Sequence, residues 1–234
     1  KLDEIRQTVV ATSQVPLYVN DPVAVTAEGT PVRIVRNAET NLGDLCADAY
    51  RALSNADIAF VNGGGIRKQI EAGDITLDDI YSVHPFGNTM CVIRVTGQQV
   101  LDALEWGARA VPSENGGFLQ VSGLTYEIHT GVASSAEKDE NGMFTRVSGE
   151  YRVKNVMVGG QPLELDKTYT LASHNYMLLG HGDGYTMFDG CEVLGEDMMV
   201  DNQVLITYIT TTLGGVVGEQ YANPYGDGRI VAVE

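Results

Sequence analysis

The sequence has few cysteines, few basic residues and no long apolar run. Its cysteines, Cys46, Cys91 and Cys191, are an odd number without a CxxC pair, which indicates buried free thiols rather than a disulfide framework or a zinc site. No apolar run approaches the roughly 20 residues of a membrane span. The 15 basic residues face 31 acidic ones, and the net charge of −16 argues against a nucleic-acid polymer as partner. A small anion held locally by arginine is still compatible with this charge.

Motifs for metal or nucleophilic catalysis are also missing. The four histidines (His84, His129, His174 and His181) lack HExxH spacing, and no acid/His cluster of a two-metal site is present. No GxSxG elbow accompanies the serines. We therefore expect no metal site, no cofactor and no catalytic residue within this chain.

The length and composition are those of an ordinary globular protein. With 234 residues, 44% hydrophobic and 20% charged, the chain can bury one full core. It opens on KLDEIR, a charged amphipathic pattern unlike a signal peptide, as in a mature protein or a fragment. We expect residues 1–30 to form a short helix and a turn-rich connecting segment, and residues 31–234 to form the domain.

Hydrophobic periodicity and turn signals predict interleaved helices and strands. A single α+β domain with mixed β-sheets and packed helices is the expected fold. Residues 130–150 are polar and rich in Gly and Ser, as in an exposed loop or hairpin tip. The predicted helices begin at Thr40 or Asn41, at Thr76 and at Thr96, and a last one runs from Asp201 to about Leu213. The predicted strands cover residues 56–61, 88–97, 122–128, 152–158 (turned by Gly159-Gly160) and 167–175.

The most unusual stretch is NGGGIR, residues 62–67, directly after a predicted strand. Three consecutive glycines cost conformational entropy and need a local reason. The pattern is neither GxGxxG nor a Walker loop. One interpretation is a tight turn with Arg67 in a surface ion pair. The other is a ligand site, in which two or three of the guanidinium groups of Arg33, Arg36 and Arg67 converge on one anion; the alternative for these arginines is a solvated basic patch.

Two further stretches allow a structural or a functional interpretation. Phe86 in HPFGN is either a core residue or an aromatic platform for a flat ligand. Tyr176 precedes a glycine-rich loop that holds Asp183. That carboxylate is either a turn residue or an acceptor for sugar hydroxyls.

Six motifs in register resemble the C-terminal domain of the 5'-nucleotidase family. This family includes UDP-sugar hydrolases and 2',3'-cyclic-nucleotide phosphodiesterases. The resemblance runs from about Arg33 to Arg229. The motifs are ETNLGDLCADAY, VNGGGIR, HPFGN, GGFLQVSGL, NYMLLGHGDGY and the terminal DGRI.

The resemblance implies a two-domain enzyme of nucleotide catabolism. An N-terminal metallophosphoesterase domain, which this sequence does not contain, would hold two divalent metal ions and hydrolyse the phosphoester. This chain would bind the nucleotide and be inactive alone. Residues 1–30 would hold the interdomain helix and the first part of the C-terminal domain. The protein would be extracellular, cell-surface or periplasmic.

The resemblance also implies roles for single residues. Phe86 matches one wall of a base-stacking clamp, and Tyr176 resembles the other, usually a Phe, in a loop one residue longer than the common form. Arg36 and Arg67 resemble arginines on the phosphate and ribose side. Asn62 matches a polar contact at the strand end, Asp183 resembles the ribose-hydroxyl acceptor, and Phe118 lies near this pocket by analogy.

Two other functions remain open from the residues. One is a stand-alone nucleoside- or nucleotide-binding protein without catalysis. The other is a structural adhesion domain with a degenerate pocket. Base preference, and the choice between mononucleotide, cyclic nucleotide and nucleotide sugar, stay open.

Overall fold

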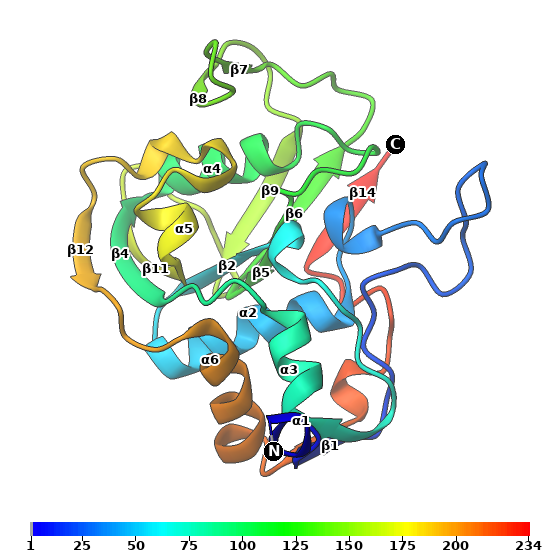
Figure 1. Ribbon diagram of the computed structural model, residues 1–234. Coiled ribbons are helices and arrows are strands. Elements are labelled where there is room, and N and C mark those ends of the chain that lie inside the picture. Colours follow the sequence, from blue (N-terminus) through cyan, green and yellow to red (C-terminus); the bar gives the residue numbers. More distant parts are fainter. Residues whose placement is uncertain (1) are drawn as a thin grey trace.

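The computed structural model describes residues 2–234, and a mixed five-stranded sheet lies at its centre (Figure 1). In order across the sheet, the strands are β12 (Glu192–Gly195), β4 (Met90–Thr96), β11 (Thr168–His174), β2 (Ile58–Asn62) and β5 (Leu119–Ser122). Strand β11 runs parallel to β2, and the other neighbouring pairs are antiparallel. The expected α+β domain with mixed sheets is confirmed.

Two smaller sheets and a hairpin surround this centre. The four-stranded sheet has the order β10 (Gln161–Pro162), β9 (Val153–Val158), β6 (Leu124–His129) and β14 (Ile230–Val233). The three-stranded sheet has the order β13 (Val216–Val217), β1 (Val9–Ser13) and β3 (Gly73–Thr76). Strands β7 (Ala136–Lys138) and β8 (Phe144–Val147) form the hairpin, inside the segment expected to be an exposed loop or hairpin tip.

Helices cover both faces of the central sheet (Figure 1). Among residues 2–234, none is long and apolar enough to cross a membrane. The α-helices are α1 (Leu2–Arg6), α2 (Asn41–Ser54), α3 (Leu77–Val83), α4 (Gly97–Gly107), α5 (Asn175–Leu178) and α6 (Asp201–Thr207). The short 3-10 helices are η1 (Ile34–Arg36), η2 (Gly63–Gly65), η3 (Gly182–Gly184), η4 (Thr186–Phe188) and η6 (Glu219–Tyr221), and η5 (Tyr208–Thr212) is a π-helix.

The alternation of side chains along β2 divides the hydrophobic core in two. Ala59 and Val61 pack with α2, α3 and α6 on one face of the sheet. Ile58 and Phe60 pack on the other face with α4, including the buried Trp106. All five residues of β2 are buried, so Asn62, its last residue, is held by a rigid, fully packed strand.

Local capping signals fix where three helices begin. Thr40 accepts a hydrogen bond from Gly43 N at the start of α2. Thr76 and Thr96 form capping boxes with Asp79 and Gln99, respectively, at the starts of α3 and α4. These helix starts were predicted, because a capping box depends only on residues three positions apart.

The last predicted helix has about the expected extent, Asp201 to Thr212, but its type changes along its length. The α-helix ends at Thr207, and the π-helix η5 follows instead of a continuous α-helix to Leu213. The hydroxyls of Thr210 and Thr211 donate to the carbonyl oxygens of Ile206 and Thr207. Such threonine bonds to the preceding turn often bend a helix.

Two further predictions concern the Gly159-Gly160 turn and the three cysteines. Gly159 and Gly160, both at positive φ, make the turn between β9 and β10 as predicted. Cys46 and Cys91 are buried free thiols, but Cys191 is only half-buried, so the expectation was wrong for that residue.

The first residues pack against later elements. Helix α1 lies at the expected place, and β1 pairs with β3 and β13. Leu17 and Val19 are buried in the same core as α2. The division of the chain at residue 30 stays a prediction.

Candidate functional site

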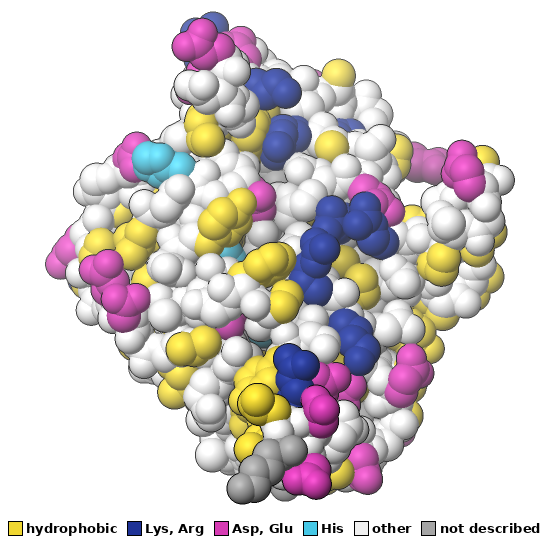
Figure 2. All heavy atoms as spheres, viewed as in Figure 1, with side chains coloured by type: hydrophobic (Ala, Val, Ile, Leu, Met, Phe, Trp, Pro, Cys, Tyr) yellow, Lys and Arg dark blue, Asp and Glu magenta, His cyan; other side chains and the backbone are white. Residues whose placement is uncertain are grey.

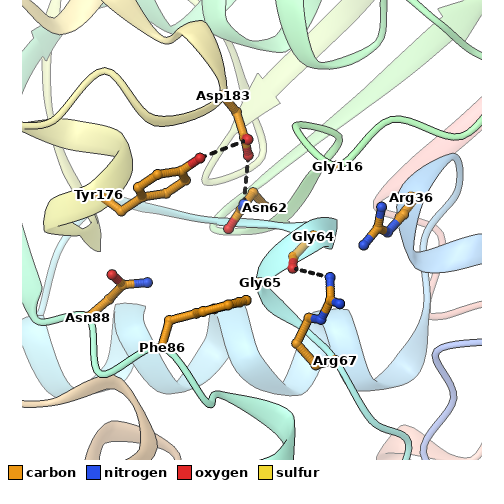
Figure 3. Close-up of a pocket in the computed structure, with 10 residues that line it drawn as sticks. All are labelled: Arg36, Asn62, Gly64, Gly65, Arg67, Phe86, Asn88, Gly116, Tyr176 and Asp183. Atoms are coloured by element: carbon orange, nitrogen blue, oxygen red, sulfur yellow. Dashed lines mark hydrogen bonds between the residues drawn. The ribbon is translucent and has the colours of Figure 1, made fainter.

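A pocket of about 370 Å³ lies where β2 ends, and the loops around it come from distant parts of the chain (Figure 3). This volume falls within the usual range for small-molecule sites. Its lining residues are Arg36, Asn62, Gly64, Gly65, Arg67, Phe86, Asn88, Gly116, Tyr176 and Asp183.

The glycines of NGGGIR are required by close backbone packing. A Cβ atom on Gly63 would lie 2.1 Å from the carbonyl oxygen of Val35, and one on Gly64 would lie 2.9 Å from that of Gly116. A Cβ on Gly65 would lie 2.6 Å from Asn62 Oδ1. None of the three has a positive φ, so the need is for space rather than for backbone freedom. The loop thereby brings η1 and the segment around Gly116 to the end of β2.

Two exposed aromatic rings stand on opposite sides of the pocket (Figure 3). Phe86 follows α3 in a turn that includes Gly87 at positive φ, and Tyr176 lies in α5. The two side chains are 59% and 45% exposed, respectively. The interpretation of Phe86 as a core residue is therefore wrong, and both rings have faces available to a ligand.

The guanidinium groups of Arg36 and Arg67 line the side of the pocket away from Tyr176 (Figure 3). Arg67 lies with its Cζ 5.8 Å from the centre of the Phe86 ring and donates weakly to Gly64 O at 3.4 Å. Among residues 2–234, the Arg36 guanidinium has neither a hydrogen-bond nor an ion-pair partner. Burial lowers the pKa of Arg36, and the like charges of Arg33 and Arg67 lower it further. Arg33 is paired with Glu114 at 2.8 Å, so two arginines rather than three are available to an anion.

The local charge differs from the charge of the whole chain. Figure 2 shows a band of Lys and Arg side chains through the middle of the viewed face, with acidic side chains mostly nearer its margin. A net charge of −16 therefore coexists with a cationic pocket. Short-range contacts with guanidinium groups decide anion binding there, because distant charges are screened by salt.

A carboxylate and an amide form the polar wall between these groups. Asp183 lies in η3 at φ +57°, and Trp106 Nε1 holds its backbone carbonyl at 2.9 Å. Asn62 Nδ2 donates to Asp183 Oδ2 at 2.7 Å, and the Tyr176 hydroxyl donates to Asp183 Oδ1 at 3.2 Å (Figure 3). The carboxylate is thus oriented before any ligand binds.

A separate acidic group lies away from this pocket. Glu39, Asp44 and Asp227 come close enough to one another to share a cation. The Arg229 guanidinium already lies 3.5 Å from Asp44 and 2.9 Å from Asp227. A permanent cation therefore balances these carboxyl groups, and we assign no metal to them.

The structure brings all six predicted site residues to one pocket. Phe118 does not line it, because this residue is fully buried in the core. Asn88 and Gly116 were not identified as site residues from the sequence, although they belong to the quoted motifs HPFGN and GGFLQVSGL, respectively. Neither was His174, which lies behind Asn62.

The sequence is similar to known proteins over most of its length. Residues 9–190 match the family model described as "5'-nucleotidase, C-terminal domain". A protein of Bacillus subtilis named "Trifunctional nucleotide phosphoesterase protein YfkN" is 36% identical over 203 residues, which cover 85% of this chain and 13% of that protein. A Vibrio cholerae protein named "5'-nucleotidase" is 34% identical over 75% of this chain and 28% of its own length.

A solved structure agrees with these matches. The 5'-nucleotidase precursor from Thermus thermophilus aligns with the whole of this chain at a TM-score of 0.79 and 30% identity. The alignment covers 41% of that protein. The chain thus spans less than half of the length of each of these three proteins.

Proposed function

This chain belongs to the family of 5'-nucleotidase C-terminal domains, and from that premise we propose that it binds the nucleotide substrate of a phosphoester hydrolase. The observation that carries the proposal is the pocket, because it joins two exposed aromatic rings, an oriented carboxylate and two arginines around one cavity. A nucleotide presents the complementary groups, which are a flat base, a sugar with hydroxyls and an anionic phosphate.

The base would lie between Phe86 and Tyr176. Stacking on an aromatic side chain contributes about 1–3 kcal/mol per base and accepts any base, because every base has a π-face. Such a clamp gives affinity with loose base selectivity. The sugar hydroxyls would then donate to Asp183, next to the amide of Asn62.

The phosphate would extend toward Arg36 and Arg67. The Arg36 guanidinium has no partner among residues 2–234, and charge-assisted hydrogen bonds contribute about 1.5–3 kcal/mol each. The order of groups around the pocket in Figure 3, from aromatic rings through Asp183 to the arginines, follows the order of groups along a nucleotide.

Hydrolysis itself is proposed to take place elsewhere in the intact protein. We propose an N-terminal metallophosphoesterase domain in cis with two divalent metal ions, and this chain as its inactive substrate-binding part. The names of the relatives and the share of their length that this chain spans support this division. A location outside the cytoplasm is part of the same proposal and rests on the resemblance alone.

Isothermal titration calorimetry with AMP and adenosine tests the proposal. The chain is expected to bind both, with AMP the tighter ligand because of the arginines. Arg36→Ala should reduce the affinity for AMP about tenfold and leave that for adenosine nearly unchanged. Arg146→Ala, in the exposed β7–β8 hairpin, is the matched control and should change neither. Equal loss in both arginine variants, or no binding by the unmodified chain, contradicts the proposal.

A further inference from the structure

A continuous hydrogen-bond chain connects the start of α5 to the pocket carboxylate. His174, the last residue of β11, accepts a hydrogen bond from Met177 N at its Nδ1 atom, at 3.3 Å. The His174 Nε2 atom lies 2.8 Å from Asn62 Oδ1. Asn62 Nδ2 then donates to Asp183 at 2.7 Å, and the Tyr176 hydroxyl donates to the other oxygen of the same carboxylate.

The two ends of this chain determine the direction of every bond in it. The backbone N–H of Met177 can only donate, so Nδ1 of His174 is the acceptor and Nε2 carries the proton of the neutral ring. At the other end, the Asp183 carboxylate accepts, so the amide nitrogen of Asn62 faces it. The Asn62 oxygen is then left to accept from His174, which matches the donor that the ring presents.

The surroundings of His174 keep its ring neutral. The side chain is 3% exposed. Burial lowers the pKa of His174 to about 4, and the nearby His84 lowers it as well. The neutral ring therefore keeps its Nδ1 acceptor for Met177 near neutral pH, with the proton on Nε2.

Glycines leave space for the hydrogen-bonded side chains of Asn62, Asp183 and Tyr176. A Cβ on Gly65 would lie 2.6 Å from Asn62 Oδ1, and one on Gly117 would lie 3.2 Å from Asp183 Cβ. A Cβ on Gly182 would lie 2.4 Å from the Tyr176 ring. The glycines of NGGGIR and GHGDG thus make room for the same set of polar side chains.

We propose that His174 is a positioning residue, which fixes the Asn62 amide and thereby holds the Asp183 carboxylate for the vicinal hydroxyls of a ribose. The inference rests on the proposed function, because it concerns the ligand of that pocket. An ionised carboxylate has about four acceptor positions. Asn62 and Tyr176 occupy two of them. Without the His174 donor, the Asn62 oxygen loses its partner, and the amide is held only through its bond to Asp183.

Two substitutions separate this role from a structural one. In His174→Asn, the amide oxygen takes the place of Nδ1 and keeps the cap of α5, but no donor reaches Asn62. In His174→Gln, the longer amide places a donor near the position of Nε2 and loses the cap. A purely structural role would make stability and ligand preference change together in the two variants.

The measurement compares the dissociation constants of adenosine and 2',3'-dideoxyadenosine. The unmodified chain should prefer adenosine about tenfold or more, because the vicinal hydroxyls donate to a carboxylate. His174→Asn should lose most of this preference, to within about twofold of unity, and should also melt at a lower temperature, because the shorter side chain leaves a buried gap and an unpaired Asn62 oxygen. His174→Gln should keep the preference and melt at a lower temperature.

The outcomes separate the inference from the function on which it rests. If the unmodified chain binds neither ligand, the proposed function fails and the role of His174 fails with it. If the unmodified chain prefers adenosine and His174→Asn keeps that preference, only the inference is overturned. If the two ligands bind equally well, the role proposed for Asp183 fails together with that of His174, while recognition of the base and the phosphate stands.

Discussion

Replacement of Phe86 by alanine tests the aromatic clamp without disturbing the fold. The Phe86 side chain is 59% exposed and follows α3 in a turn, so the substitution leaves no cavity in the core. We expect the free energy of unfolding to change by less than about 0.5 kcal/mol. Ligand affinity should change much more, because one of the two surfaces against the base is removed.

The size of the loss follows from the contacts of the ring. Stacking contributes about 1–3 kcal/mol per base, which corresponds to a factor of about 5 to 150 in the dissociation constant. The Arg67 guanidinium lies 5.8 Å from the ring centre, but this cation–π contact of about 0.5 kcal/mol is made without ligand, so its loss belongs to the small change in stability and not to the loss of affinity.

Calorimetry with AMP and a chemical denaturation curve measure both effects on one preparation. Tyr225→Ala is the matched control, since this ring is 47% exposed and lies outside the pocket. It should leave the AMP affinity unchanged. An AMP affinity in Phe86→Ala within twofold of that of the unmodified chain would refute the clamp.

Three further substitutions test the site and its support. Tyr176→Phe keeps the ring but removes the hydroxyl bond to Asp183, so calorimetry should show AMP affinity about 2- to 10-fold lower, and a loss as large as that of Tyr176→Ala would contradict this. Gly63→Ala places a Cβ 2.1 Å from a backbone oxygen and should cost about 2 kcal/mol or more in urea denaturation, whereas Gly131→Ala, with nothing within 4 Å, should cost under about 0.5 kcal/mol. Burial raises the pKa of the Asp44 carboxyl above its ordinary value. The stability that Asp44 contributes is therefore full at a pH below the ordinary pKa and falls as the pH rises toward the raised pKa. Asp44→Asn, which does not titrate, should lose less stability than the unmodified chain between pH 5 and pH 8.

Features set by neighbouring residues could be predicted from the sequence. The capping boxes at Thr76 and Thr96 and the buried strand β2 follow from spacings of a few residues. The gathering of Arg36, Phe86 and Asp183 at one pocket was predicted through the resemblance, because three residues so far apart in the sequence have no local signal that joins them.

Other features depend on contacts that a sequence does not encode locally. The glycines of NGGGIR were interpreted as either a tight turn or a ligand site, and the contacts that require Gly63 and Gly64 are with the backbone at Val35 and Gly116. His174 reads as the end of a buried strand, and its role depends on a hydrogen bond to Asn62 on the neighbouring strand. The change from an α-helix to a π-helix after Thr207 was not predicted from the sequence.

Saturation-transfer NMR from the chain to AMP tests the central claim most directly. The account predicts transfer that is strongest at the protons of the base and is lost in both Phe86→Ala and Tyr176→Ala. An absence of transfer to AMP at millimolar concentration, or base transfer that persists in both variants, would contradict it.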